Sequence, residues 1–113
     1  MKEFLCVYTG SKDKLEAWEA LTQEERANKR QEGVKAWRNW AESYRAKIVS
    51  HGGPLSETKA VTAEGISDTN NNLTAYVIVH AASHDDAARM FVDHPHFAIF
   101  PGEAVEIMEV MEL

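Results

Sequence analysis

The order of strand-like and helix-like segments constrains the fold of this 113-residue chain more than any other feature of its sequence. Near the N-terminus, "EFLCVY" at residues 3–8 is rich in β-forming residues, and its weak alternation predicts a strand buried on both faces. Residues 12–47 have helical character, and a capping-box pattern from Thr22 to Glu25 predicts that they form two helices. The first half of the chain therefore predicts a strand followed by a helical region.

The middle of the chain predicts two strands separated by a turn. Gly52-Gly53-Pro54 ends the helical region and predicts an irregular or edge strand, because proline cannot donate a hydrogen bond to a sheet. "GISDTNNN" at residues 65–72 predicts a polar turn, since asparagine tolerates left-handed backbone conformations. "LTAYVIVHAA" at residues 73–82 is the clearest strand of the chain.

The last segments predict a helix and a closing strand. Ser83 predicts the N-cap of a helix over residues 84–93, whose first turn carries acidic residues that the helix dipole favours. Residues 104–113 alternate as a strand, with Ile107 on one side and Met108 on the other.

This order of strand, helix, strand, strand, helix, strand predicts one α+β domain over residues 1–113. With right-handed crossovers it gives a ferredoxin-like βαββαβ protomer, in which a four-stranded antiparallel sheet carries both helices on one face. The other face would stay uncovered, and a domain of this size would leave much apolar surface in water. We therefore expect a two-fold homodimer whose sheets pack together as a dimeric α+β barrel.

Composition and charge exclude several classes of protein. The formal net charge is −6, which argues against a nucleic-acid surface, since such a surface needs clustered Lys and Arg. The single cysteine, Cys6, excludes an intramolecular disulfide and lies in an apolar run, as an inert buried thiol does. No signal peptide or membrane-length apolar stretch is visible, so we expect no membrane partner and a cytoplasmic location.

His94 and His96, in "DHPHF", are the first candidates for chemistry. On an extended segment both rings would project to one side and could chelate a metal together with Asp93, His51 or His80. The alternative is that His94 ends the preceding helix, where an imidazolium gains from the helix dipole, while Pro95 aims the last strand. We favour this structural role and predict no metal, although the loop could still border a pocket and supply a general base.

The remaining candidate residues lie in the two middle strands and the long helix. His51 precedes Gly52 and Gly53, whose backbone amides could meet an acidic group of a ligand. His80 and Tyr76 share one sheet face and could form an acid–base pair if that face lines a cavity. In the long helix, an apolar stripe includes Trp37, whereas Trp40 lies off the stripe and is expected to face a partner or a pocket.

Several segments resemble the YCII-related family, including its DGPF-type branch: "GGPL" at 52–55, "AYVIVHAAS" at 75–83, "HDDAARMFVDHPHF" at 84–97, "GEAVEIMEV" at 102–110 and, more loosely, "GVKAWRNW". The resemblance implies the dimeric α+β barrel scaffold. The chain departs from the family where the Asp-Gly-Pro-Phe signature should fall, because it has "GISDTNNN" there. It also has Gly33 where some YCII-type proteins carry a histidine shortly after an arginine, paired with an aspartate as a suspected catalytic dyad.

Two functional hypotheses follow. The first is a binding protein that holds a small apolar or aromatic ligand near the helix–sheet cleft. The second is a cofactor-independent lyase or isomerase that uses a histidine, His94, His51 or His80, as general acid or base. No Walker loop, GxGxxG, HExxH or nucleophile elbow occurs, so we expect no cofactor.

Overall fold

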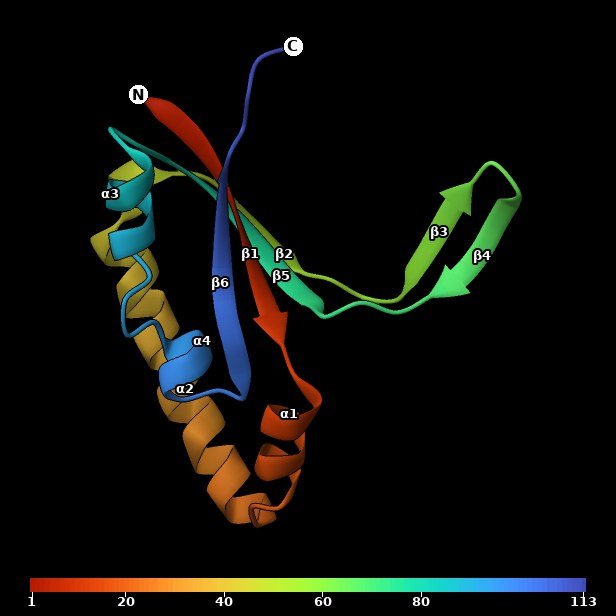
Figure 1. The fold of residues 1–113 in the computed structure, drawn as a ribbon. Helices are drawn as coiled ribbons and strands as arrows, with labels where there is room; N and C mark the ends of the chain where they lie inside the picture. The colour runs from red at the N-terminus through yellow and green to blue at the C-terminus, as the bar shows by residue number, and fades with distance from the viewer.

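A computed structural model describes all residues, 1–113. Four strands form an antiparallel sheet in the order β2-β5-β1-β6, and helices lie over one of its faces (Figure 1). The sheet strands are β1 (Lys2–Gly10), β2 (Ile48–Pro54), β5 (Leu73–Ala81) and β6 (Gly102–Glu109). This strand order confirms the ferredoxin-like βαββαβ protomer predicted from the sequence.

Two helices join β1 to β2, as the sequence predicts. They are α1 (Lys12–Glu19) and α2 (Gln23–Ser43), and a short 3-10 turn (Arg45–Lys47) follows them. At the start of α2, Glu25 N–H donates to the Thr22 hydroxyl, and the Glu25 carboxylate accepts from Thr22 N–H, so the capping box is complete. No helix is long and apolar enough to cross a membrane.

The core lies between the sheet and the helices. Side chains of β1 and β5 that point towards the helices are buried, and they pack with residues of α3 and of the turn after it. The core residues are Phe4, Cys6, Tyr8, Val77, Val79, Ala81, Ala87, Met90 and Phe91. This period of two is the expected pattern of a strand that covers one core. The contact between α2 and this core runs largely through Trp37 and Trp40.

The opposite face of the sheet has no helix over it (Figure 1). Leu5 pairs with Met108 and Val7 pairs with Tyr76 across the strands of this open face. Val7 is buried among its neighbours, whereas Leu5 is half-buried and Met108 is 44% exposed. The prediction that the first strand is buried on both faces is therefore confirmed at Val7 and only partly met at Leu5, which is half-buried.

The turn predicted over residues 65–72 is wrong in part. Residues Gly65–Thr69 form strand β4, which pairs with β3 (Thr58–Thr62) as a separate two-stranded hairpin. Asn70–Asn72 alone remain irregular between β4 and β5. The hairpin projects from the body of the molecule on the side away from α2 (Figure 1).

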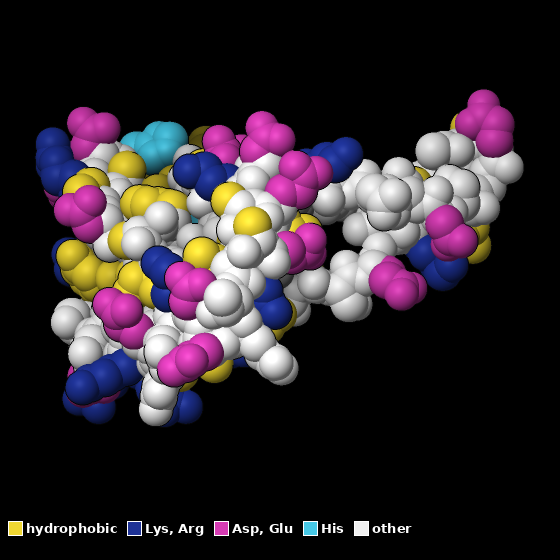
Figure 2. All heavy atoms as spheres, turned by 90° about the horizontal axis from the view of Figure 1, so that it is seen from below, with side chains coloured by type: hydrophobic (Ala, Val, Ile, Leu, Met, Phe, Trp, Pro, Cys, Tyr) yellow, Lys and Arg dark blue, Asp and Glu magenta, His cyan; other side chains and the backbone are white.

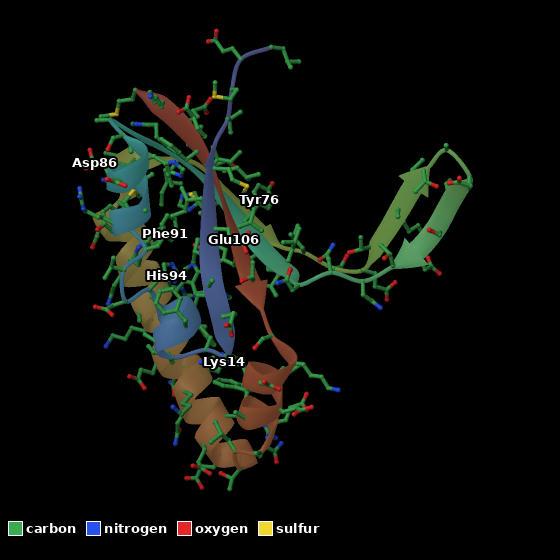
Figure 3. The ribbon with its side chains drawn as sticks, viewed as in Figure 1. Lys14, Tyr76, Asp86, Phe91, His94 and Glu106 are labelled. Carbon is green, nitrogen blue, oxygen red and sulfur yellow. The ribbon has the colours of Figure 1, made fainter.

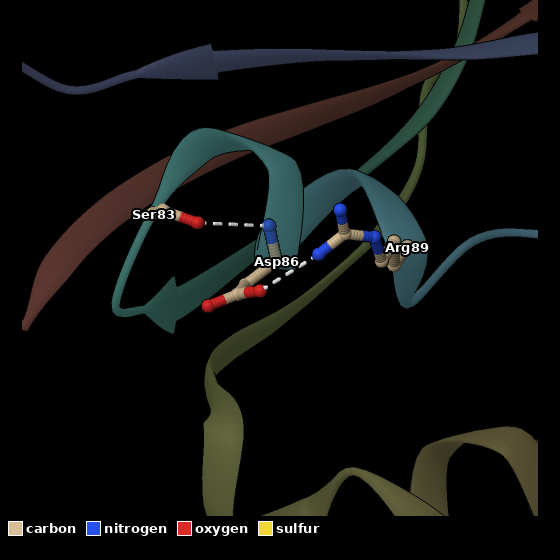
Figure 4. Close-up of polar contacts among 3 residues, drawn as sticks. All are labelled: Ser83, Asp86 and Arg89. Carbon is tan, nitrogen blue, oxygen red and sulfur yellow. Dashed lines mark hydrogen bonds and ion pairs between the residues drawn. The ribbon is translucent and has the colours of Figure 1, made fainter.

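The second helical region is shorter than predicted. Helix α3 (His84–Arg89) begins at Ser83, whose Oγ accepts from Asp86 N–H at 3.1 Å, while Arg89 binds the Asp86 carboxylate (Figure 4). The chain then turns through Asp93, which has a positive φ of 59°, and starts α4 (Pro95–Ala98). The predicted helix over 84–93 is thus wrong beyond Arg89.

His94 begins a helix instead of ending one. Its side chain accepts the backbone N–H of His96 and so caps the N-terminus of α4, in which Pro95 occupies the first turn. The predicted imidazolium at a helix C-terminus is therefore wrong, because this ring must present an unprotonated nitrogen. Proline suits this place because its missing N–H would have no partner in the first turn.

Candidate functional site

A cavity of about 310 Å³ lies between α2 and the β2 edge of the sheet. Its wall includes aromatic residues of α2 and β1 and residues of β2 and β5. We call it the aromatic cleft; its lining residues are Tyr8, Trp37, Trp40, Ala41, His51, Gly53, Pro54, Ala75, Tyr76 and Val77. Seven of these ten residues are hydrophobic, as expected of a small-molecule site.

The helix side of the cleft follows from residue spacing. Trp37, Trp40 and Ala41 lie three and four residues apart on α2, so they share one face of the helix. Both indole rings pack on the core, and Trp40 Nε1 donates to the Met90 carbonyl at 2.6 Å. The small side chain of Ala41 leaves room beside these two large rings.

The strand side of the cleft follows from an irregularity in β2. The pairing of β2 with β5 shifts between Ser50 and Gly53. Gly52 has a φ of 59°, and a Cβ at this position would lie 2.1 Å from the Tyr76 carbonyl oxygen, so only glycine fits. The resulting bulge places His51 at the mouth of the cleft, where its side chain is exposed.

Tyr8, at the wall of the aromatic cleft, forms a buried pair with His94. His94 lies on the helical side of the sheet, close to α4 (Figure 3). The Tyr8 hydroxyl lies 3.3 Å from His94 Nε2, while His94 Nδ1 accepts the His96 backbone N–H at 3.0 Å. Because Nδ1 is an acceptor, a neutral His94 carries its proton on Nε2 and donates it to Tyr8. The rings of Trp37 and Trp40 meet His94 edge-on, with centroids 4.5 and 4.6 Å away.

Burial keeps this pair uncharged. Desolvation, with a smaller contribution from the neighbouring His96, lowers the pKa of His94 to about 3. Desolvation, with a smaller contribution from Cys6, raises the pKa of Tyr8 above its usual range. A base with so low a pKa, enclosed and bonded at both ring nitrogens, is poorly suited to abstract a proton at neutral pH.

His96 lies on the other side of Tyr8. Its Nε2 donates to the Thr9 carbonyl at 2.8 Å, and Gly102 approaches the ring so closely that a Cβ there would lie 2.4 Å from Nε2. Burial lowers the pKa of His96, while its bonds to the Thr9 and Ala104 carbonyls offset part of this effect. The bond to Thr9 holds α4 against the end of β1.

A second cavity of about 750 Å³ borders His96 at the end of β1. Its lining includes Ser11, Lys12 and the asparagines 70–72, together with Leu15 and Phe100. Only two of its twelve lining residues are hydrophobic, and the one imidazole on it is occupied by Thr9. The aromatic cleft is therefore the stronger candidate for holding an organic ligand.

The structure brings together four of the candidate residues and separates the others. Trp40, His51, Gly53 and Tyr76 line the aromatic cleft, but the Gly52 amide donates to the Ser50 hydroxyl at 3.3 Å instead of facing a ligand. The predicted anion site at this amide is therefore not formed.

His80 is not part of the aromatic cleft. Its Nδ1 lies 2.9 Å from Met1 Sδ on the open face of the sheet. His80 and Tyr76 are four residues apart on β5, which separates them by roughly 13 Å along the strand. The suggested acid–base pair of these two residues is therefore wrong for this protomer.

The histidines do not gather as metal ligands. No group of three or more His, Cys, Asp or Glu side chains lies close enough together to hold a metal ion. His94 uses one ring nitrogen for the His96 amide and the other for Tyr8. His94 and His96 instead serve the packing around Tyr8.

Tyr8 and Trp37 are the aromatic lining residues that the sequence did not single out as a site. Tyr8 lies in an apolar strand, and Trp37 lies on the apolar stripe of α2, so both were interpreted as core. The one available signal was the hydroxyl of Tyr8 in a run that otherwise has aliphatic, aromatic and thiol groups, since a buried hydroxyl requires a partner.

Comparison with known proteins identifies a similar fold. A scan of protein-family models and a search of curated proteins found no match. Among solved structures, the chain resembles 5-chloro-2-hydroxyhydroquinone dehydrochlorinase (TftG) from Burkholderia phenoliruptrix AC1100, in complex with 2,5-dihydroxybenzoquinone. The TM-score is 0.56 at 18% sequence identity, and the match covers 96% of this chain and 93% of TftG. At this identity the likeness shows the fold alone, and it confirms the α+β fold class that the sequence predicts.

Proposed function

We propose that this protein is a YCII-related homodimer of the cytoplasm that binds a small single-ring compound in the aromatic cleft. The observation that carries the proposal is the cleft itself, in which Tyr8, Trp37 and Trp40 offer aromatic surface and His51 offers a polar group at the mouth. Aromatic walls with few polar groups are typical of sites for organic ligands. Cys6, whose burial raises its pKa to about 12, suits a reducing compartment.

The size of the cleft supports a ligand with one ring. Its volume of about 310 Å³ lies at the lower end of the range for small-molecule sites, roughly 300–1,000 Å³. An apolar cavity of roughly 150 Å³ holds benzene, so there is room for a ring with several substituents. The compound in the TftG complex, 2,5-dihydroxybenzoquinone, is also of this size.

The Tyr8 hydroxyl supports a ligand that carries an oxygen. Its oxygen accepts from His94 Nε2, which leaves the hydroxyl proton without a hydrogen-bond acceptor on the protein. Tyr8 lines the cleft, so this proton is suited to a carbonyl or phenol oxygen of a bound ring. Trp40 Nε1 is already bonded to Met90 and contributes ring surface only.

A thermal-shift screen tests the proposal. We expect substituted phenols, benzoquinones or benzoates to raise the melting temperature of the wild type, with or without EDTA, and matched rings without oxygen to raise it less. Ala41→Leu fills the cleft and should abolish the shift, whereas Ala27→Leu, on an exposed part of the same helix, should retain it. An unchanged shift in Ala41→Leu would place the ligand elsewhere.

The alternative function is a cofactor-independent enzyme with His51 as general base. It is favoured by the position of His51, the only histidine that lines the aromatic cleft. For a ligand found in the screen, His51→Gln should lower kcat by about 10² or more for proton abstraction, isomerisation or elimination, while His80→Gln should have no effect. Equal turnover by His51→Gln and the wild type would rule out His51 as the general base and would leave ligand binding as the proposed function.

A further inference from the structure

The β3–β4 hairpin, which we call the arm (residues 58–69), pairs only with itself. Its two strands form a separate sheet, and neither pairs with a strand of the four-stranded sheet. The space-filling view shows the arm standing clear of the body (Figure 2). The radius of gyration is 15.8 Å, larger than the roughly 13 Å of a compact domain of this length.

The arm exposes apolar side chains that a lone hairpin should hide. Val61 and Ile66 lie directly opposite each other in its register, and they are 76% and 74% exposed. Such a cross-strand pair contributes only roughly 0.2–1 kcal/mol, and an isolated two-stranded hairpin is marginally stable in water. Another surface packed against Val61 and Ile66 would therefore stabilise the arm, and the body of its own chain does not supply that surface.

The direction of the arm indicates where that surface lies. The arm leaves the sheet between Pro54 and Leu73, at neighbouring ends of β2 and β5. From there it extends on the side of the open sheet face, away from α2 (Figure 1). A second copy of this chain packed on the open face would lie alongside the arm, and a two-fold axis would bring the partner's arm to the same place on the first copy.

The interface area also favours a second copy of this chain. Four strands about 4.8 Å apart, with eight residues at about 3.3 Å each, present roughly 500 Å², so two packed faces bury roughly 1,000 Å². A standard interface buries about 1,600 Å². Each arm face, with two five-residue strands, adds roughly 160 Å² on itself and as much on the partner, so two arms bring the total to roughly 1,600 Å².

We propose that the arm clasps a second copy of this chain and contributes the apolar pair Val61–Ile66 to the dimer interface. This inference rests on the homodimer of the proposed function and assigns a second contact surface to it, in addition to the open face. The clasp is reciprocal, so each dimer has two arms in equivalent contacts.

Sedimentation equilibrium of the full chain tests the clasp. Val61→Ser combined with Ile66→Ser should raise the dimer dissociation constant at least tenfold. Val92 is 68% exposed on the helical side, and Val92→Ser should not change the dissociation constant. Hydrogen exchange of the wild type provides a measurement without substitutions. Amides of β3 and β4 should be protected above the dissociation constant and should lose at least tenfold of that protection on dilution below it.

The results of these two experiments distinguish failure of the proposed arm contact from failure of the proposed dimer. A wild-type dimer whose arm amides exchange freely, or whose dissociation constant is unchanged in the double variant, would overturn the clasp and leave the dimer intact. A wild type that is monomeric at every concentration would overturn both the clasp and the dimer. Ligand binding in the aromatic cleft is read separately, from the thermal shift of the Ala41→Leu variant.

Discussion

Gly52 is the single residue on which the shape of the aromatic cleft depends most. Its positive φ and its close approach to the Tyr76 carbonyl exclude any side chain, and the bulge that results carries His51 to the mouth of the cleft. Gly53, the next residue, has open space where a Cβ would lie. Of these two adjacent glycines, only Gly52 has no room for a side chain.

We therefore expect Gly52→Ala to lower the free energy of unfolding by at least about 2 kcal/mol, because it adds backbone strain and a clash with Tyr76. Gly53→Ala should change it by less than about 1 kcal/mol. Urea unfolding of the two variants measures the difference. Similar stability of both variants would show that the bulge is not fixed by Gly52.

His94 should make stability depend on pH. Its pKa falls from 6.5 in the unfolded chain to about 3 when folded, so between these values the unfolded chain binds more protons and stability decreases as pH falls. The loss for one histidine is at most about 2 kcal/mol from pH 7 to pH 5. His96, whose pKa is also lowered, acts in the same direction.

Urea unfolding at pH 7 and pH 5 measures this dependence. In His94→Gln the stability should fall less between the two pH values than in the wild type, because one of the two shifted imidazoles is gone. An equal decrease in both proteins would exclude His94 as its source.

At this scale the sequence predicted part of the candidate site. His51, Gly53 and Trp40 were recognisable because glycine, proline and indole side chains stand out locally, although Trp40 shares the face of α2 that carries Trp37 and does not lie off it. The Tyr8–His94 bond joins residues that are 86 positions apart, and it depends on how α4 packs against β1. No local pattern encodes such a contact, so the histidine was predicted as a helix end and not as the buried partner of Tyr8.

Among the elements, α2 has the clearest start signal. Thr22 and Glu25 satisfy each other's backbone amides at exposed positions, which is a local interaction and was predictable from four letters of sequence. Thr22→Ala should therefore lower the free energy of unfolding by about 1 kcal/mol, as loss of an N-cap does. The neighbouring substitution Gln23→Ala should have little effect in the same urea titration; an equal loss would argue against the cap.

The arm is the element that the sequence did not reveal. Its two-residue turn, Ala63-Glu64, lacks the Asn-Gly or Asp-Gly pair that marks a hairpin, and the three asparagines after it favoured a turn instead. Its strands have no core to face, so their alternation carries little apolar signal. Periodicity in the sequence predicts an element that buries one face in the core. The arm buries no face in the core of its own chain, so periodicity gives no signal for it.

For the whole molecule, the proposed dimer depends on the open sheet face. Met108 lies on it beside Leu5, and Met108→Lys would place a charge in the proposed interface. We expect the dimer dissociation constant to rise at least about 100-fold, which corresponds to about 2.7 kcal/mol. Val92→Lys, on the helical side, is the control, and sedimentation velocity measures both; a Met108→Lys protein that remains dimeric would place the interface elsewhere.

The bulge at Gly52 also bears on aggregation at high protein concentration. β2 is an outermost strand of the sheet, and such a strand normally offers a straight template on which other molecules can polymerise. Here the row of amide and carbonyl groups is interrupted at the bulge, and Pro54 has no amide hydrogen to offer. The bulge that shapes the cleft therefore also disfavours pairing of the β2 edge with strands of other molecules, the contact from which fibrils grow.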